Sequence, residues 1–113
     1  MNNLLNKKCV PCEVGGASLP IEKINSYHAL VSSWQVVNDD IKPMRLEHEF
    51  NFKNFMEAMN FVNKVSVLSE SEGHHPDIYI FYNKVKLTLY THAVQGLSEN
   101  DFILASKINE IKI

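Results

Sequence analysis

Long apolar runs are missing from this chain of 113 residues. No stretch approaches the roughly 18 apolar residues that a membrane-spanning helix needs. The N-terminus, MNNLLNKKCV, also has no apolar run of the length found in signal peptides. The sequence therefore predicts a cytoplasmic protein that has no membrane partner.

Blocks of basic residues are absent too. The chain has 11 Lys and Arg against 13 Asp and Glu, for a formal net charge of -2. Direct binding to nucleic acid is not expected, because such binding depends on clustered positive charge. The length predicts a single domain, 1–113. Pro11, Gly15 and Gly16 punctuate residues 1–19, which we interpret as an irregular N-terminal arm.

Cysteine is scarce, with only Cys9 and Cys12 in the chain. Two cysteines make no disulfide framework. A structural zinc site needs four ligands, and no second C-x-x-C or nearby C-x-x-x-H is present. Thioredoxin-like redox pairs follow a strand and open a helix, whereas this pair precedes any periodic segment. A reduced pair in the arm is the favoured interpretation, and metal or redox chemistry is the alternative.

Apolar periodicity predicts seven elements in the order helix, two strands, helix, two strands, helix. The predicted ranges are 20–32, 34–38, 44–52, 54–69, 77–82, 85–91 and a helix that follows Ser98. Ser98 and Asp101 have the spacing of a capping box at the start of that last helix. Paired strands separated by helices predict an α+β fold, in which three helices pack on one face of a four-stranded antiparallel sheet.

The helix at 54–69 is apolar around most of its circumference. Its main stripe is Phe55, Ala58, Met59, Val62 and Val65. The remaining apolar residues lie off that stripe: Met56, Phe61, Val67 and Leu68. The helix must therefore bury more than one side. A thick core would explain this, but we favour a self-association surface.

The segment EGHHPDIYIFYNKVKLTLYTH places histidines at both ends of a predicted hairpin. A two-residue turn at Asn83-Lys84 would put Ile80 opposite Leu87 and Ile78 opposite Leu89. In the same register His75 lies opposite His92, and opposed residues share a sheet face. Pro76 restricts the backbone of His75 to extended conformations but does not restrict His74, whose side chain can take either direction. All three rings are thus expected to line one pocket.

A histidine cluster in a pocket allows four interpretations: structural hydrogen bonding, general acid/base catalysis, a metal site or a pH switch. The carboxylates near enough to complete a metal site are Glu70, Glu72 and Asp77. Two histidines adjacent in sequence, such as His74 and His75, do not easily bind the same metal ion. We therefore assign no metal ligands. No Ser or Cys nucleophile framed by an orienting carboxylate is evident.

The chain resembles the pterin-4a-carbinolamine dehydratase family over nearly its whole length. The pattern is E-x-x-x-H-H-P, Y-N-x-V, T-H, G-L-S, D and A-x-x-I. The matching residues here are Glu70, His74, His75, Pro76, Tyr82, Asn83, Val85, Thr91, His92, Gly96, Leu97, Ser98, Asp101, Ala105 and Ile108.

This resemblance implies dehydration of 4a-hydroxytetrahydrobiopterin to a quinonoid dihydropterin, in tetrahydrobiopterin recycling. It implies a pterin substrate, no cofactor, a homodimer or homotetramer, and an aromatic amino acid hydroxylase in the same pathway. The alternative is a non-catalytic interaction module, because animal members also serve as dimerisation cofactors of a homeodomain transcription factor. Some relatives have assembly roles.

The resemblance also assigns roles to residues. The catalytic candidates are His74, His75 and His92, of which His74 and His92 would transfer protons while His75 orients the substrate. The substrate-binding candidates are Glu70, His75 and Asp101, although Asp101 could be only a cap partner. Gly73 and Ala93 depart from the residues that many relatives carry, and neither departure removes a proton carrier.

Overall fold

The structure is a computed structural model that describes residues 3–10 and 17–112. The elements follow the predicted order, with short 3₁₀ helices added. They are η1 (Asn3–Asn6), α1 (Ile21–His28), η2 (Ala29–Val31), β1 (Gln35–Val37), β2 (Arg45–Asn51), α2 (Phe55–Glu72), β3 (Asp77–Phe81), β4 (Lys84–Leu89), η3 (His92–Val94) and α3 (Glu99–Asn109). Within the described ranges, no helix is long and apolar enough to cross a membrane.

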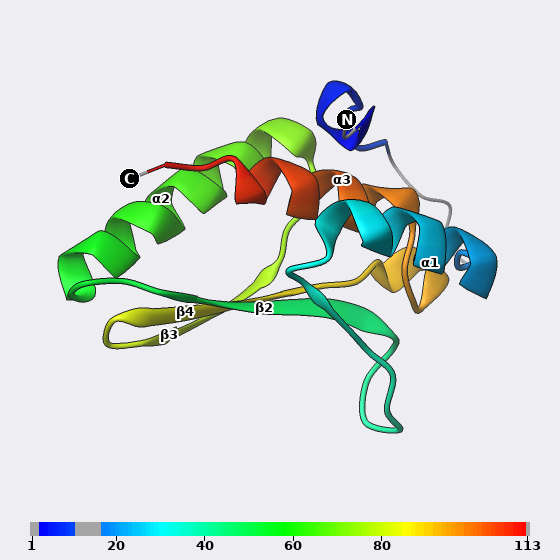
Figure 1. Cartoon of the computed structure of the whole chain (residues 1–113), viewed down its shortest axis with the longest axis horizontal. Helices are drawn as coiled ribbons and strands as arrows, with labels where there is room; N and C mark the ends of the chain where they lie inside the picture. Colours follow the sequence, from blue (N-terminus) through cyan, green and yellow to red (C-terminus); the bar gives the residue numbers. More distant parts are fainter. Residues whose placement is uncertain (1–2, 11–16, 113) are drawn as a thin grey trace.

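The four strands form one antiparallel sheet in the order β1-β2-β4-β3. The three α-helices lie together on one side of it, and the opposite side is left uncovered by helices (Figure 1). The predicted α+β architecture is therefore confirmed. Central strand β4 supplies Val85, Leu87 and Leu89 to the core, all fully buried. Helix α3 packs beside α1 and α2 and is buried along most of its length.

Helix α2 has well-defined ends. Asn54 caps its N-terminus by accepting a hydrogen bond from the Glu57 backbone N–H at 2.9 Å. Gly73 ends the helix in the left-handed region, with φ of 68°. Glycine reaches this region at little cost, so the chain can turn sharply into the histidine pair that follows.

The buried face of α2 differs in part from the predicted stripe. Phe55 is exposed, whereas Phe61, which we had placed off the stripe, is buried. The Phe61 ring packs 4.7 Å from the Phe50 ring and 5.0 Å from the Phe52 ring. These contacts with the end of β2 rotate the buried face towards Phe61, which helical periodicity alone could not reveal.

The register of the β3–β4 hairpin differs from the prediction by two residues. Ile80 lies opposite Val85 and Ile78 opposite Leu87, around a turn at 82–83. Tyr82 takes a left-handed φ of 55°. Asn83 exchanges backbone and side-chain hydrogen bonds with Phe52, at 2.8 and 3.1 Å. This long-range anchor fixes the turn, and the two-residue shift keeps every side chain on its predicted face.

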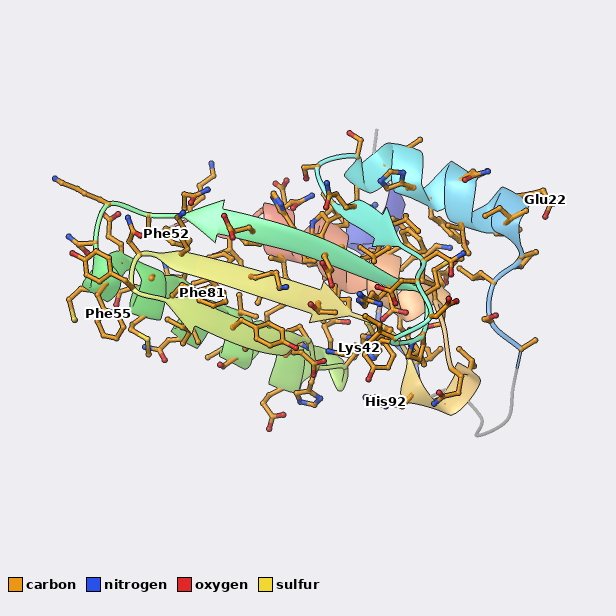
Figure 2. All side chains as sticks on the ribbon, turned by 90° about the horizontal axis from the view of Figure 1, so that it is seen from below. Glu22, Lys42, Phe52, Phe55, Phe81 and His92 are labelled. Atoms are coloured by element: carbon orange, nitrogen blue, oxygen red, sulfur yellow. The ribbon has the colours of Figure 1, made fainter. Side chains whose placement is uncertain are left out.

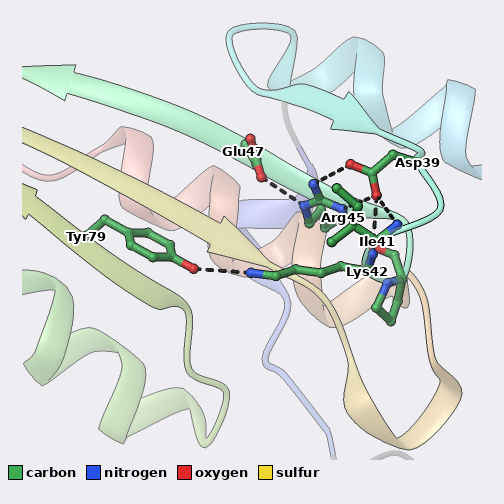
Figure 3. A network of polar contacts seen from close by, with 7 residues as sticks. Asp39, Ile41, Lys42, Arg45, Glu47 and Tyr79 are labelled. Atoms are coloured by element: carbon green, nitrogen blue, oxygen red, sulfur yellow. Dashed lines mark hydrogen bonds and ion pairs between the residues drawn. The ribbon is translucent and has the colours of Figure 1, made fainter.

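The loop between β1 and β2 is tied to the sheet by a polar network (Figure 3). Arg45 pairs with Asp39 at 2.8 Å and with Glu47 at 2.8 Å, and Lys42 donates to the Tyr79 hydroxyl at 3.3 Å. The Arg45 guanidinium holds the pKa of Asp39 well below its usual range. The loop is therefore held against β3 rather than left free.

The described part of the N-terminal arm packs on the helices. Leu4 is buried, and the Val10 backbone N–H donates to the Asn100 side chain at 2.9 Å. Lys8 donates to the Ser71 carbonyl at 2.7 Å, and the Cys9 backbone N–H donates to Glu72 at 2.9 Å. The arm thus joins the end of α2 to the start of α3. Cys12, the second residue of the C-x-x-C pair, lies outside the described residues.

Candidate active site

His74 faces a buried carboxylate. The residue follows the left-handed turn at Gly73, and its Nε2 lies 2.6 Å from Oδ1 of Asp101. Only 13% of the His74 side chain is exposed, and none of the Asp101 side chain. The end of one helix and the beginning of another therefore bring together residues 27 positions apart.

The Asp101 carboxylate is held by its own helix and by the chain after β4. Its Oδ2 accepts a hydrogen bond from the Thr91 hydroxyl at 2.8 Å and from the Ser98 backbone N–H at 2.9 Å. The predicted capping box of Ser98 and Asp101 is confirmed. One carboxylate oxygen is thus held by two donors of the surrounding backbone and side chains, while the other faces His74. His74 therefore contacts a carboxyl group that is excluded from solvent.

His75 makes a different kind of contact. Its Nε2 pairs with the carboxylate of Glu70, one turn back on α2. Both side chains are largely exposed, at 56% and 78%. Water screens such a pair, so it contributes little to stability. The pair orients the His75 ring at the surface, where an incoming molecule could reach it.

His92 reaches the site from the segment that follows β4. It begins η3, is exposed, and lies beyond the end of the strands (Figure 2). Its ring centroid is 4.5 Å from that of Tyr90. The loop that carries it is closed by hydrogen bonds between the backbones of Thr91 and Gly96, at 2.8 and 3.4 Å. His92 is therefore held in place by its backbone and by an aromatic neighbour.

All three histidines line one open pocket of about 380 Å³. The predicted opposition of His75 and His92 is wrong because the hairpin register differs, but the rings still reach a common space. The other lining residues are Gly73, Pro76, Asp77, Tyr90 and Thr91. The volume lies within the range of roughly 300–1,000 Å³ that is typical of small-molecule sites.

The site residues predicted from sequence fall into two groups. His74, His75 and His92 line the pocket, while Glu70 and Asp101 stand behind two of them as hydrogen-bond partners. Tyr90 was not predicted for the site, nor was any role for the Thr91 hydroxyl. For Tyr90 the signal was its position near His92, and for Thr91 it was the T-H part of the family pattern. Neither signal indicated the contacts of Thr91 with Asp101 or of Tyr90 with the His92 ring.

A second hollow of about 400 Å³ lies elsewhere on the sheet. It is lined by Ser33, Gln35, Glu47, His48, Glu49 and Lys86. It contains one imidazole, and burial lowers the pKa of His48. The histidine pocket is the better candidate because it holds three proton carriers. Among residues 3–10 and 17–112, no three His, Cys, Asp or Glu side chains are grouped so that they could hold a metal ion.

A helix-covered antiparallel sheet with a histidine-lined pocket at its end defines a small α+β protein with a candidate small-molecule site. Comparison with known proteins gives the family. The model of the family described as Pterin 4 alpha carbinolamine dehydratase matches residues 17–111. The chain belongs to this family.

Three relatives illustrate the similarity. The chain is 47% identical over 111 residues to a protein of Alkaliphilus metalliredigens named as a candidate pterin-4-alpha-carbinolamine dehydratase, covering 97% of this chain and 96% of the relative. It is similar to the crystal structure of a transcriptional coactivator/pterin dehydratase from Brucella melitensis, with a TM-score of 0.73 and 32% identity. The match covers 81% of this chain and 95% of the other. It is also similar to a pterin dehydratase-like protein described as a RuBisCO assembly factor in the alpha-carboxysome. That comparison has a TM-score of 0.57 and 26% identity, and covers 68% of this chain and 86% of the other.

Proposed function

We propose that this protein dehydrates a pterin-4a-carbinolamine to a quinonoid dihydropterin by histidine acid/base catalysis. Family membership and the names of its relatives support the dehydratase activity. The observation that carries the proposed mechanism is the convergence of His74, His75 and His92 on one pocket. By the resemblance, the hydroxylated pterin would come from an aromatic amino acid hydroxylase, which would place the reaction in tetrahydrobiopterin recycling.

The reaction removes water across a ring carbon and the adjacent ring nitrogen. The carbon–oxygen bond breaks as the hydroxyl takes a proton, and the nitrogen loses its proton as the carbon–nitrogen double bond forms. One acid and one base are therefore required, and the number of protons is unchanged overall. Imidazole suits both roles because it exchanges protons near neutral pH.

We assign the base to His74 and the acid to His92. The Asp101 carboxylate, 2.6 Å from His74, would stabilise the imidazolium that forms when His74 accepts the nitrogen proton. His92 is exposed and can regain a proton from water after each turnover. His75, oriented by Glu70, would bind and orient the pterin. Asp101 acts through His74, since its buried oxygens are already occupied.

The experiment is turnover of chemically or enzymatically generated carbinolamine by the purified chain. His74→Ala and His92→Ala should each lower kcat by about 10²- to 10⁴-fold, the usual contribution of a positioned acid or base. His48→Gln is the matched control, because His48 is a partly buried histidine outside the pocket. It should leave kcat unchanged. If the wild-type protein is active and both alanine variants have the same kcat as the wild type, the proposed acid and base are rejected.

The second candidate is an interaction module, a coactivator or assembly factor without catalysis. One structural relative is described as a transcriptional coactivator/pterin dehydratase and another as a RuBisCO assembly factor. Helix α2 also has exposed apolar residues that could contact a partner. A module of that kind has no use for a buried carboxylate that supports a pocket histidine. Complete lack of dehydration by the wild-type protein would favour this candidate.

A further inference from the structure

Thr91 occupies a position that the proposed roles leave unexplained. It follows β4, is buried, and its backbone pairs with Gly96. Its hydroxyl lies 2.8 Å from Oδ2 of Asp101 and 2.7 Å from the Ser98 hydroxyl. Thr91 is therefore one hydrogen bond away from the carboxylate that contacts His74.

The chemistry of these groups fixes where each proton lies. A carboxylate oxygen accepts hydrogen bonds, so the single hydroxyl proton of Thr91, 2.8 Å from Oδ2, points to Asp101. The Ser98 hydroxyl must then donate to the oxygen of Thr91. For the same reason, Nε2 of His74 must carry the proton that is shared with Asp101. Neutral His74 thus keeps its lone pair on Nδ1.

We infer that Thr91 is a positioning residue that acts on His74 through Asp101. Two donors, the Thr91 hydroxyl and the Ser98 backbone N–H, hold Oδ2 and leave Oδ1 for His74. Loss of the hydroxyl would leave Oδ2 with one of these donors, so that the carboxylate could turn and the His74 tautomer would no longer be fixed. The assignment of Nδ1 as the basic atom of the reaction rests on the proposed function. The tautomer itself does not depend on it.

Thr91→Val tests this inference because valine has nearly the same shape and lacks the hydroxyl. We expect kcat to fall about 10-fold, the loss of one hydrogen bond to a charged group, with little change in KM. The nitrogen NMR shifts of the His74 ring, measured at a pH where the ring is neutral, should move towards a mixture of tautomers. Thr91→Ser should restore both values.

The matched control is Thr88→Val. Thr88 is a buried threonine in β4 whose hydroxyl has no hydrogen-bond partner among the described residues. This variant should change neither kcat nor the His74 shifts. If Thr91→Val does not fold, Thr91→Cys keeps a similar shape with a much weaker donor and takes its place.

The NMR measurement separates this inference from the proposed function. A tautomer change in Thr91→Val, in a protein that proves to have no dehydratase activity, would reject the function and retain the positioning role. Three results would overturn the inference. They are an unchanged His74 tautomer, an unchanged kcat in an active enzyme, and an equal loss of activity in Thr88→Val.

Discussion

The thiol of Cys9 lies where its charged form is disfavoured. The residue is buried, and its Sγ donates to the Asn100 carbonyl at 3.6 Å. Burial, with the Glu72 carboxylate nearby, raises the pKa of Cys9 to about 12. Metal binding and thiol exchange both require a thiolate. The described half of the C-x-x-C pair therefore has the surroundings of a structural residue.

Native Cys9 should resist alkylation. At pH 8 the folded protein should react with iodoacetamide at Cys9 far more slowly than a free cysteine, because almost no thiolate is present and the sulfur is buried. Peptide mapping by mass spectrometry distinguishes Cys9 from Cys12. The urea-unfolded chain is the control and should react quickly. Rapid labelling of native Cys9 would show that the arm does not hold it as described.

Among the elements, the N-terminal arm and the ends of α2 and α3 meet at Glu72. Its carboxylate accepts from Lys107 at 2.7 Å and from the Cys9 backbone N–H at 2.9 Å. Burial would raise the pKa of Glu72, but these two hydrogen bonds and nearby lysines together hold it below its ordinary value of 4.5. The ionised side chain is thus bound more strongly in the folded protein than in the unfolded chain.

Glu72→Gln should lower the free energy of unfolding at neutral pH by about 1–2 kcal/mol, the loss of a charged hydrogen-bond partner. Because the folded pKa is depressed, the contribution is fully present above about pH 4.5 and disappears as pH falls through the folded pKa. Urea unfolding at pH 7 and at lower pH measures the loss of unfolding free energy and its dependence on pH. Glu110→Gln, at an exposed position just after α3, should have little effect. A pH-independent difference for Glu72→Gln would contradict the assignment.

The order of the elements and some of their ends could be predicted from local chemistry, although α2 was predicted to end at 69 and continues to Glu72. The Ser98 and Asp101 capping box and the stop at Gly73 depend on residues near one another in the chain. The hairpin register could not be predicted, because the bonds between Asn83 and Phe52 join distant segments. Local turn preference pointed to Asn83-Lys84, and the long-range contact moved the turn by one residue.

The candidate site shows the same division. The three histidines stand in recognisable sequence patterns, and we predicted that they share a pocket, although from a hairpin register that is wrong by two residues. The link from Asp101 to His74 was hidden because the capping role already gave Asp101 an explanation. One Asp101 oxygen, Oδ2, serves the cap while the other faces the histidine, and only the packing of α3 beside the end of α2 reveals this second role.

For the molecule as a whole, the outward side of α2 carries two well-exposed apolar side chains among polar residues. Met56 and Val67 are 65% and 73% exposed. They lie about three turns apart, hence on the same side of the helix. The sheet face opposite the helices is also open, but it carries Tyr79, with the amino groups of Lys42 and Lys86 near its ring; Figure 3 shows Tyr79 and Lys42. Of the two surfaces, α2 is better suited to bury against another copy of the chain.

We expect the protein to form a homodimer or homotetramer through α2. Placing charges at both of these exposed apolar positions, with Met56→Glu and Val67→Glu together, should shift the assembly towards the 12.9 kDa monomer in light scattering. Each substitution is at the surface, so we expect it to change folding stability by no more than about 0.5 kcal/mol. Ile41→Glu is the control, because Ile41 is an equally exposed apolar residue in the distant β1–β2 loop.

Turnover by the same double variant separates assembly from catalysis. The described residues that line the histidine pocket belong to 73–77 and 90–92, and none of them lies in α2. A monomer should therefore keep the His74–Asp101 pair and dehydrate carbinolamine at the wild-type rate per chain. If the double variant has the same assembly mass as the wild type, the side of α2 with Met56 and Val67 is not the interface. If the variant dissociates and loses activity while remaining folded, the pocket depends on a neighbouring copy, and the single-chain site proposed here is incomplete.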